Sequence, residues 1–278
     1  MRAPRFIPFV LLLVAIPVPL LATRAAELSK DDVDFRKLTL DKPKNEHLNY
    51  RLFVPLGYDS KRKYPLVLFL HGATGRGSDN TKQLTGANQL GTHFWIAREV
   101  QNTFPAFVLV PQCPTGENWS EPELNRPGPS LLLTMDALLK TQREFSIDPA
   151  LIYVVGQSMG GLGVYSLVQN YPEKWAAAIV LSAFDNLTNV LALTSVPLWV
   201  FQGDADPSVP IDTVRDMMRQ LRKAHAKLRY TEYHRAGHEI WDQAFAEPDL
   251  LTWLSSQKRE DSPAAEGQVG SGAPLQKP

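Results

Sequence analysis

Cysteine is almost absent from this chain, since Cys113 is the only one among its 278 residues. A single cysteine excludes an intramolecular disulfide and a cysteine-based zinc cluster. Cys113 stands in a Pro-Gln-Cys-Pro segment that follows an apolar run. Free cysteine usually packs as a small apolar side chain, so we expect Cys113 to be buried.

An excess of either charge is also lacking. Lysine and arginine together number 29, and aspartate and glutamate together number 29. No long basic run is present, so nothing in the chain indicates a nucleic-acid partner. With 44% hydrophobic and 21% charged residues, the composition is that of an ordinary globular protein with enough length for one large core. The chain contains no internal repeat and no boundary of a second domain.

One long hydrophobic run lies at the N-terminus. Arg2 and Arg5 precede an apolar stretch over residues 6–22, and small residues follow at Ala25 and Ala26. This order is typical of a secretory signal peptide. The stretch is marginal for a bilayer span, which needs about 20 residues, and prolines interrupt it. We expect residues 1–26 to be a signal peptide and the protein to be secreted or periplasmic, without stable membrane insertion after cleavage. The alternative is an uncleaved membrane anchor.

The remainder divides into one large domain over residues 27–257 and a tail over 258–278. The tail is small, polar and rich in proline and glycine, which predicts disorder. Residues 114–129 are also polar and rich in proline, glycine and asparagine, so we expect a long surface loop there.

Within the large domain, short continuous apolar runs alternate with helical patterns. The runs suit strands buried on both faces of a mainly parallel sheet: residues 66–70, 107–110, 151–155, 177–181 and 198–201, with a last strand over 228–234. Helical spacing occurs over 131–145, 164–171 and 211–221, and a further helix contains Trp241 and Phe245 before Pro248 interrupts it. Looser alternation over 33–40 and 48–54 predicts an antiparallel pair at a sheet edge. The whole pattern predicts a doubly wound α/β sheet.

The segment Gly156-Gln-Ser158-Met-Gly160 stands between a buried strand and a helix. Gly-x-Ser-x-Gly in this context is typical of a nucleophile elbow, a tight turn that exposes the serine above a sheet. The glycines are needed because the turn leaves no room for side chains. Sheet elements use most of the positions between Ser158 and Asp206, so no large cap is expected.

A serine nucleophile needs a histidine base and a carboxylate that orients the histidine. In α/β-hydrolases these follow in the order Ser, Asp or Glu, His. Asp204 and Asp206 follow the strand over 198–201, and His238 lies in a glycine-marked loop after the last strand. Both aspartates are candidates for the acid, and either could instead form an Asx-turn.

The other histidines considered lie before the elbow, near a helix end or within the last strand: His47, His93, His225 and His234. His234 and His238 are four residues apart, but Gly237 and the strand-to-loop context argue against a helical metal pair. We expect no metal and no cofactor.

The oxyanion that forms during acyl transfer needs two backbone donors, one of them from the loop after an earlier strand. The strand over 66–70 leads into His71-Gly72-Ala73-Thr74. Gly72 allows close approach, so the N–H groups of Ala73 and Met159 are the expected oxyanion hole. The segment lacks the Gly-Lys-Ser/Thr ending of a phosphate-binding loop.

Several blocks together resemble the predicted-peptidase and esterase family of α/β-hydrolases, which is related to phospholipase/carboxylesterases, polyhydroxybutyrate depolymerase-like esterases and dienelactone hydrolases. The blocks are Tyr64-Pro-Leu-Val-Leu-Phe-Leu-His-Gly-Ala-Thr-Gly-Arg-Gly-Ser-Asp-Asn, Val110-Pro-Gln-Cys-Pro with Trp119, Gly156-Gln-Ser-Met-Gly-Gly, Gly203-Asp-Ala-Asp-Pro-Ser-Val-Pro and Gly237-His-Glu-Ile-Trp. The likeness extends from about residue 48 to residue 254.

The resemblance implies that Asp206 is the triad acid and that Asp204 is structural. This chain departs from the family pattern at Thr74 and Arg76, where a glycine and an acidic residue are expected. That departure leaves the rim of the pocket, and with it the substrate, open.

The resulting hypothesis is a serine esterase with the triad Ser158, Asp206 and His238, acting on a small-molecule or oligomeric ester. Trp119 and Trp241 are candidate substrate-binding residues, because aromatic walls suit apolar or sugar substrates. Trp241 is equally suited to core packing. Two alternatives remain: a small-peptide hydrolase with the same triad, and a non-catalytic binding protein on the same fold.

Overall fold

The computed structural model describes residues 35–43, 46–121, 123 and 126–259. The signal peptide expected over residues 1–26 lies outside the described residues, and so does the expected tail except for Lys258 and Arg259. No helix in the described part of the chain combines the length and the apolar character needed to cross a bilayer.

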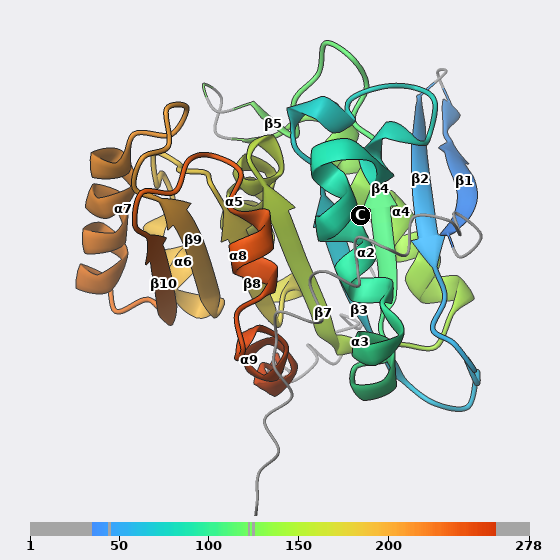
Figure 1. Ribbon diagram of the computed structural model, residues 1–278. Coiled ribbons are helices and arrows are strands. Elements are labelled where there is room, and N and C mark those ends of the chain that lie inside the picture. The colour runs from blue at the N-terminus through green and yellow to red at the C-terminus, as the bar shows by residue number, and fades with distance from the viewer. Residues whose placement is uncertain (1–34, 44–45, 122, 124–125, 260–278) are drawn as a thin grey trace, which may run out of the picture.

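An eight-stranded sheet forms the centre of the molecule (Figure 1), in the order β1-β2-β4-β3-β7-β8-β9-β10. Its strands are β1 (Phe35–Asp41), β2 (His47–Phe53), β3 (Tyr64–Leu70), β4 (Phe107–Pro111), β7 (Ile147–Gln157), β8 (Ala177–Leu181), β9 (Leu198–Gly203) and β10 (Leu228–Tyr233). β2 pairs antiparallel with β1 and with β4, and all other pairings are parallel. The predicted mainly parallel sheet with an antiparallel N-terminal pair is therefore confirmed.

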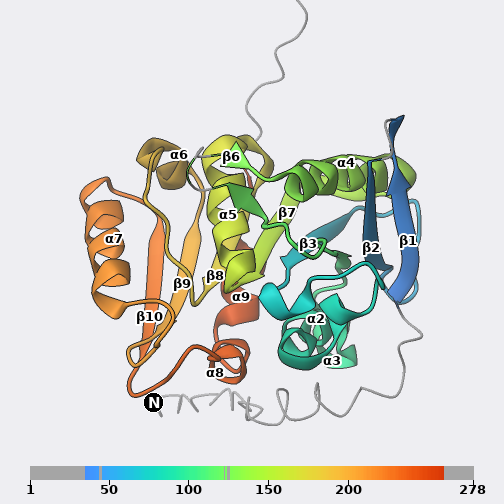
Figure 2. The ribbon, with the colours of Figure 1, turned by 90° about the horizontal axis from the view of Figure 1, so that it is seen from above.

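Helices cover both faces of the sheet, as the view from above shows (Figure 2). Along one face lie α4 (Pro129–Glu144), α5 (Met159–Asn170), α6 (Val190–Ser195) and α7 (Ile211–Lys223). Against the other pack α2 (Gln89–Ile96), α3 (Arg98–Thr103), α8 (Trp241–Phe245) and α9 (Leu250–Ser256). Short 3₁₀ turns complete the regular structure: η2 (Ala73–Gly75), η3 (Lys82–Leu84), η4 (Gly86–Asn88) and η6 (Pro172–Lys174).

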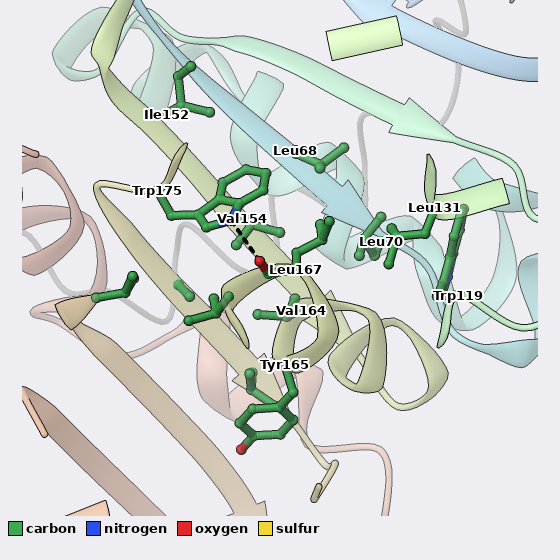
Figure 3. Close-up of a cluster of buried hydrophobic side chains, with 14 of the residues drawn as sticks. Leu68, Leu70, Trp119, Leu131, Ile152, Val154, Val164, Tyr165, Leu167 and Trp175 are labelled. Carbon is green, nitrogen blue, oxygen red and sulfur yellow. Dashed lines mark hydrogen bonds between the residues drawn. The ribbon is translucent and has the colours of Figure 1, made fainter. Parts of the chain in front are cut away.

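The continuous apolar runs exist because each central strand is covered on both sides. All seven residues of β3 are buried. Leu66, Leu68 and Leu70 face the α5 side, whereas Val67 and Phe69 face the α2 side. Figure 3 shows the α5 side, where side chains of β3 and β7 pack against those of α5. This double-sided core fixes the strand ends that carry the polar side chains described below.

Three helices, α2, α3 and α6, were not expected from the sequence. α2 is buried over Gly91–Ile96, so it shows no alternation of apolar and polar faces. α3 and α6 are each only six residues long. Pro248 separates α8 from α9, as expected.

Residues 114–129 are a long connection, but part of it is ordered against the core. It contains the two-stranded pair β5 (Ser120–Glu121) and β6 (Arg126–Pro127). Trp119, immediately before β5, is fully buried. Only α6 and loops connect β8 with β9, so no large cap is inserted there.

Candidate active site

The turn from β7 into α5 has the geometry of a nucleophile elbow. Ser158 is the residue between them and adopts φ 53° and ψ −121°, a strained conformation for a residue with a side chain. A Cβ added at Gly156 would collide with the carbonyl oxygen of Gly160, and one added at Gly160 would collide with that of Leu70. Close approach of β7, α5 and β3 therefore requires glycine at both positions, as the sequence predicted.

His238 joins two other side chains from separate strand ends. Its Nε2 lies 2.8 Å from Oγ of Ser158, and its Nδ1 lies 2.8 Å from Oδ2 of Asp206. With Nδ1–H donating to the carboxylate, Nε2 is left to accept the serine hydroxyl proton. The His238 side chain is 23% exposed and that of Asp206 is fully buried. The His238 imidazole can thus reach a bound molecule, while the Asp206 carboxylate is shielded from water.

Four donors converge on the Asp206 carboxylate. Besides His238, Oδ2 accepts from Nε2 of Gln202 at 2.9 Å, and Oδ1 accepts from the backbone N–H of Ser208 at 2.7 Å and of Val209 at 3.0 Å. Burial alone would raise the pKa of Asp206, but the hydrogen bond from His238 and the other three donors outweigh it and lower the pKa. The carboxylate therefore stays ionised beside the imidazole at neutral pH.

Asp204 has a different task from Asp206. It accepts from Nδ1 of His234 at 2.8 Å and from the backbone N–H of Arg235 at 2.5 Å. The hydrogen bond from His234 is the main cause of the lowered pKa of Asp204. The His234 side chain is 79% exposed. Between the two aspartates that the sequence left as candidates, the structure places only Asp206 on His238, and Asp204 fastens the loop that leads to it.

Ser182, at the end of β8, connects the elbow with the histidine loop. Its Oγ donates to the carbonyl oxygen of His238 at 2.7 Å, and the backbone N–H of Ser158 donates to the carbonyl oxygen of neighbouring Leu181 at 2.8 Å. Ser182 is buried and has a φ of 48°. Neither Ser182 nor Gln202 was singled out in the sequence. Their position at the carboxyl ends of buried strands, where sites form in α/β sheets, is the signal that was available.

The expected oxyanion donors lie at two helix starts beside Ser158. Ala73 is the first residue of η2, and Met159 is the first residue of α5. The first N–H groups of a helix have no acceptor within it, and they carry its positive dipole end. A Cβ added at Gly72 would lie 3.6 Å from Cβ of Ser158, so the η2 loop adjoins the elbow. This arrangement suits stabilisation of negative charge next to Ser158.

His71, under this loop, is held in its neutral form. Its Nε2 accepts from the backbone N–H of Cys113 at 3.0 Å, and its Nδ1 donates to the carbonyl oxygen of Gly72 at 2.6 Å. Burial is the main cause that lowers its pKa to about 4. Cys113 is buried as expected, and burial raises the pKa of its thiol to about 12. The His71 side chain and the backbone of Cys113 therefore support the loop.

The two candidate tryptophans differ in their relation to the triad. Trp119 is fully buried, and its Nε1 donates to the carbonyl oxygen of His71 at 3.0 Å. Its ring consequently supports the η2 loop from below and presents no surface to a substrate in this structure. The Trp241 ring packs edge-on against the imidazole of His238, with ring centroids 5.8 Å apart. Trp241 thus contacts His238, but it is itself only 6% exposed and belongs to the buried core.

The two departures from the family pattern each make a contact between loops. Thr74 Oγ1 accepts from Nδ2 of Asn88 at 3.2 Å. Nε of Arg76 donates to the carbonyl oxygen of Glu117 at 2.6 Å, and its guanidinium also bonds Oδ1 of Asn118. Arg76 thereby ties the η2 loop to the connection over residues 114–129. Among the residues that the structure describes, no group of three or more His, Cys, Asp or Glu side chains is placed to hold a metal ion.

The family described as "Putative esterase" matches residues 43–266 of this chain. Among solved structures, a thermostable esterase is 35% identical with a TM-score of 0.77, and the match covers 81% of this chain and 63% of that chain. This chain thus spans less than two thirds of the length of that esterase. No curated protein matches the chain.

More distant structures share the fold alone. A feruloyl esterase module from Clostridium thermocellum is 13% identical with a TM-score of 0.60, covering 80% of this chain and 88% of that chain. S-formylglutathione hydrolase from Staphylococcus aureus is 16% identical with a TM-score of 0.57, covering 79% of this chain and 98% of that chain. The family match includes the elbow, the acid loop and the histidine loop, so this chain is a member of that esterase family with an α/β-hydrolase fold.

Proposed function

We propose that the protein hydrolyses carboxylic esters through an acyl-enzyme intermediate, with Ser158 as nucleophile, His238 as base and Asp206 as the acid that orients it. The observation that carries the proposal is the pair of 2.8 Å contacts through which His238 bridges Ser158 and Asp206. Serine is a weak nucleophile without such a base.

In the proposed reaction, Oγ of Ser158 attacks the ester carbonyl while its proton passes to Nε2 of His238. The carboxylate of Asp206 stabilises the imidazolium that results. The N–H groups of Ala73 and Met159 receive the negative charge that develops on the carbonyl oxygen. Removing one such donor typically costs about 10²–10³ in rate. His238 then protonates the leaving alcohol, and water attacks the acyl-enzyme in a second step with His238 again as base.

Small-molecule or oligomeric esters are the proposed substrate class, because membership of an esterase family supports it. No cofactor takes part in these steps. We also propose that residues 1–26 direct the protein out of the cytoplasm, on the basis of the charge and hydropathy pattern of that segment. Peptide hydrolysis by the same triad is the alternative activity, and it requires protonation of a poorer leaving group.

A fluorophosphonate tests the nucleophile, and a pair of matched ester and amide substrates tests the reaction. We expect the wild-type protein to be labelled at Ser158 and to cleave the ester. Ser158→Ala removes only the attacking oxygen, so it should keep the fold but lose labelling and lose turnover by several orders of magnitude. Comparable turnover in that variant would show that Ser158 is not the nucleophile. Preferential cleavage of the amide would favour the peptidase.

A further inference from the structure

Asn88 lies between the two segments that build the reaction centre. It is the last residue of η4 and directly precedes α2. Its Oδ1 accepts from the backbone N–H of Gly72 at 2.8 Å and from Nε2 of Gln157 at 3.2 Å. Gly72 directly precedes Ala73, and Gln157 directly precedes Ser158. We propose that Asn88 is a positioning residue that fixes the oxyanion donor of Ala73 relative to the nucleophile. This inference rests on the proposed function.

Backbone partners settle the orientation of both amides. The N–H of Gly72 can only donate, so the Asn88 atom that faces it is the oxygen, and Nδ2 faces Oγ1 of Thr74. The carbonyl of Ala87 can only accept, so Gln157 presents its NH₂ group there, at 2.8 Å. The same NH₂ group reaches Oδ1 of Asn88. The contacts therefore form one directional network rather than a set of interchangeable polar neighbours.

Burial makes this network stiff. Asn88 is fully buried and Gln157 is 1% exposed, so water is not available to replace a lost partner. A buried donor left without an acceptor is destabilising, which favours the single arrangement in which Gly72 and Gln157 both reach Oδ1. Thr74, one of the two departures from the family pattern, adds a third contact from the η2 loop.

The network should act on the transition state more than on substrate binding. Oxyanion donors are effective only when they lie about 2.7–3.1 Å from the oxygen on which charge develops. Without Asn88 the η2 loop keeps its donor but loses the side-chain hydrogen bonds that connect Gly72 with Gln157. Such a shift weakens an interaction made in the transition state, so it lowers kcat while KM stays nearly constant.

The test compares the kinetics of Asn88→Ala with those of the wild type. Active sites are counted by complete fluorophosphonate labelling, so that misfolded protein does not enter kcat. We expect Asn88→Ala to lose about 10- to 100-fold in kcat per active site, less than removal of a donor outright, with KM within about threefold. The affinity for a trifluoromethyl ketone, which forms a tetrahedral adduct with the serine, should fall in parallel.

Asn80 offers a matched control, because it is another buried asparagine whose side chain bonds backbone carbonyls, those of Leu38 and Tyr50. Asn80→Ala should lower the Tm yet leave kcat per active site unchanged. If Asn88→Ala folds poorly, Thr74→Val still removes one contact and should lower kcat a few-fold with little change in Tm.

Two outcomes separate the inference from the activity on which it rests. A wild-type protein that neither cleaves esters nor reacts with the fluorophosphonate would overturn the proposed function and the inference with it. A wild-type protein that does both, together with an Asn88→Ala variant that keeps kcat and ketone affinity per active site, would overturn the inference alone.

Discussion

Asp204 and Asp206 carry the same carboxylate group but differ in the residues that they contact. Asp204 and Asp206 both follow β9, yet one holds His234 and a loop N–H while the other holds His238. Composition and spacing do not show which of the two aspartates contacts His238, because that depends on the direction in which each carboxylate points in the folded protein. The family resemblance implies Asp206 as the acid, and Asp206 is the aspartate that contacts His238.

Exchange of these two carboxylates for amides should have unequal effects. Asp206→Asn removes the charge beside His238 and favours the wrong ring tautomer, so we expect kcat to fall by about 10⁴, as in other triads. Asp204→Asn loosens the loop at Arg235 and should cost much less activity. Steady-state kinetics at equal folded fraction, measured by circular dichroism, compares them. A larger kcat loss in Asp204→Asn would reverse the assignment.

His71 should make folding stability depend on pH. Its pKa is about 4 in the folded protein and about 6.5 when unfolded, so the unfolded chain binds more protons between these values. The contribution of His71 to the free energy of unfolding is fully present above pH 6.5. It is lost as the pH falls toward 4, and the total loss is about 3 kcal/mol.

Urea unfolding at pH 7 and pH 4.5 measures this loss, with His71→Gln as the control that cannot titrate. The free energy of unfolding should fall by about 2–3 kcal/mol more in the wild type than in the variant. Equal losses in both proteins would mean that His71 keeps an ordinary pKa in the folded state.

Among the elements of the fold, the strands buried on both faces were the easiest to predict. β8 begins and ends where its apolar run does, at Ala177 and Leu181. α2 was not predicted because all of its residues after Leu90 are buried, which removes the periodic pattern that reveals a surface helix. Asn88 was not predicted either, because its contacts are with residues 16 and 69 positions away and leave no local pattern in the sequence.

The packing of β3, β7 and α5 gives a prediction about Gly160. Gly160→Ala places a methyl group against the carbonyl oxygen of Leu70, and neither backbone can yield without moving the elbow. Overpacking typically costs about 1–3 kcal/mol and occasionally more, so the Tm should fall by several degrees and activity should be lost with it. Gly237→Ala is the matched control, because a Cβ there meets nothing within 4 Å. A similar Tm for both variants would contradict the close packing.

At the scale of the whole molecule, we expect the N-terminal segment to direct the protein out of the cytoplasm. Arg2, Arg5 and the apolar stretch over residues 6–22 favour export. Mass spectrometry of protein from its native host should find a mature N-terminus between Thr23 and Glu27. An intact Met1 or Arg2 terminus in a membrane fraction would instead support the anchor.

Ser158 and His238 are in contact although they lie far apart along the chain. Ser158 and His238 stand 80 positions apart. β8, β9 and β10 lie between them along the chain, and these strands follow β7 in the sheet in parallel. Parallel pairing closes long loops and is slow for that reason. During refolding from urea, tryptophan fluorescence should therefore recover first as the core around Trp95 and Trp175 forms. Reactivity of Ser158 toward a fluorophosphonate should appear later, when the edge strand β10 has paired and His238 reaches Ser158. The rate at which the reactive site forms can therefore be measured separately from the rate at which the core forms.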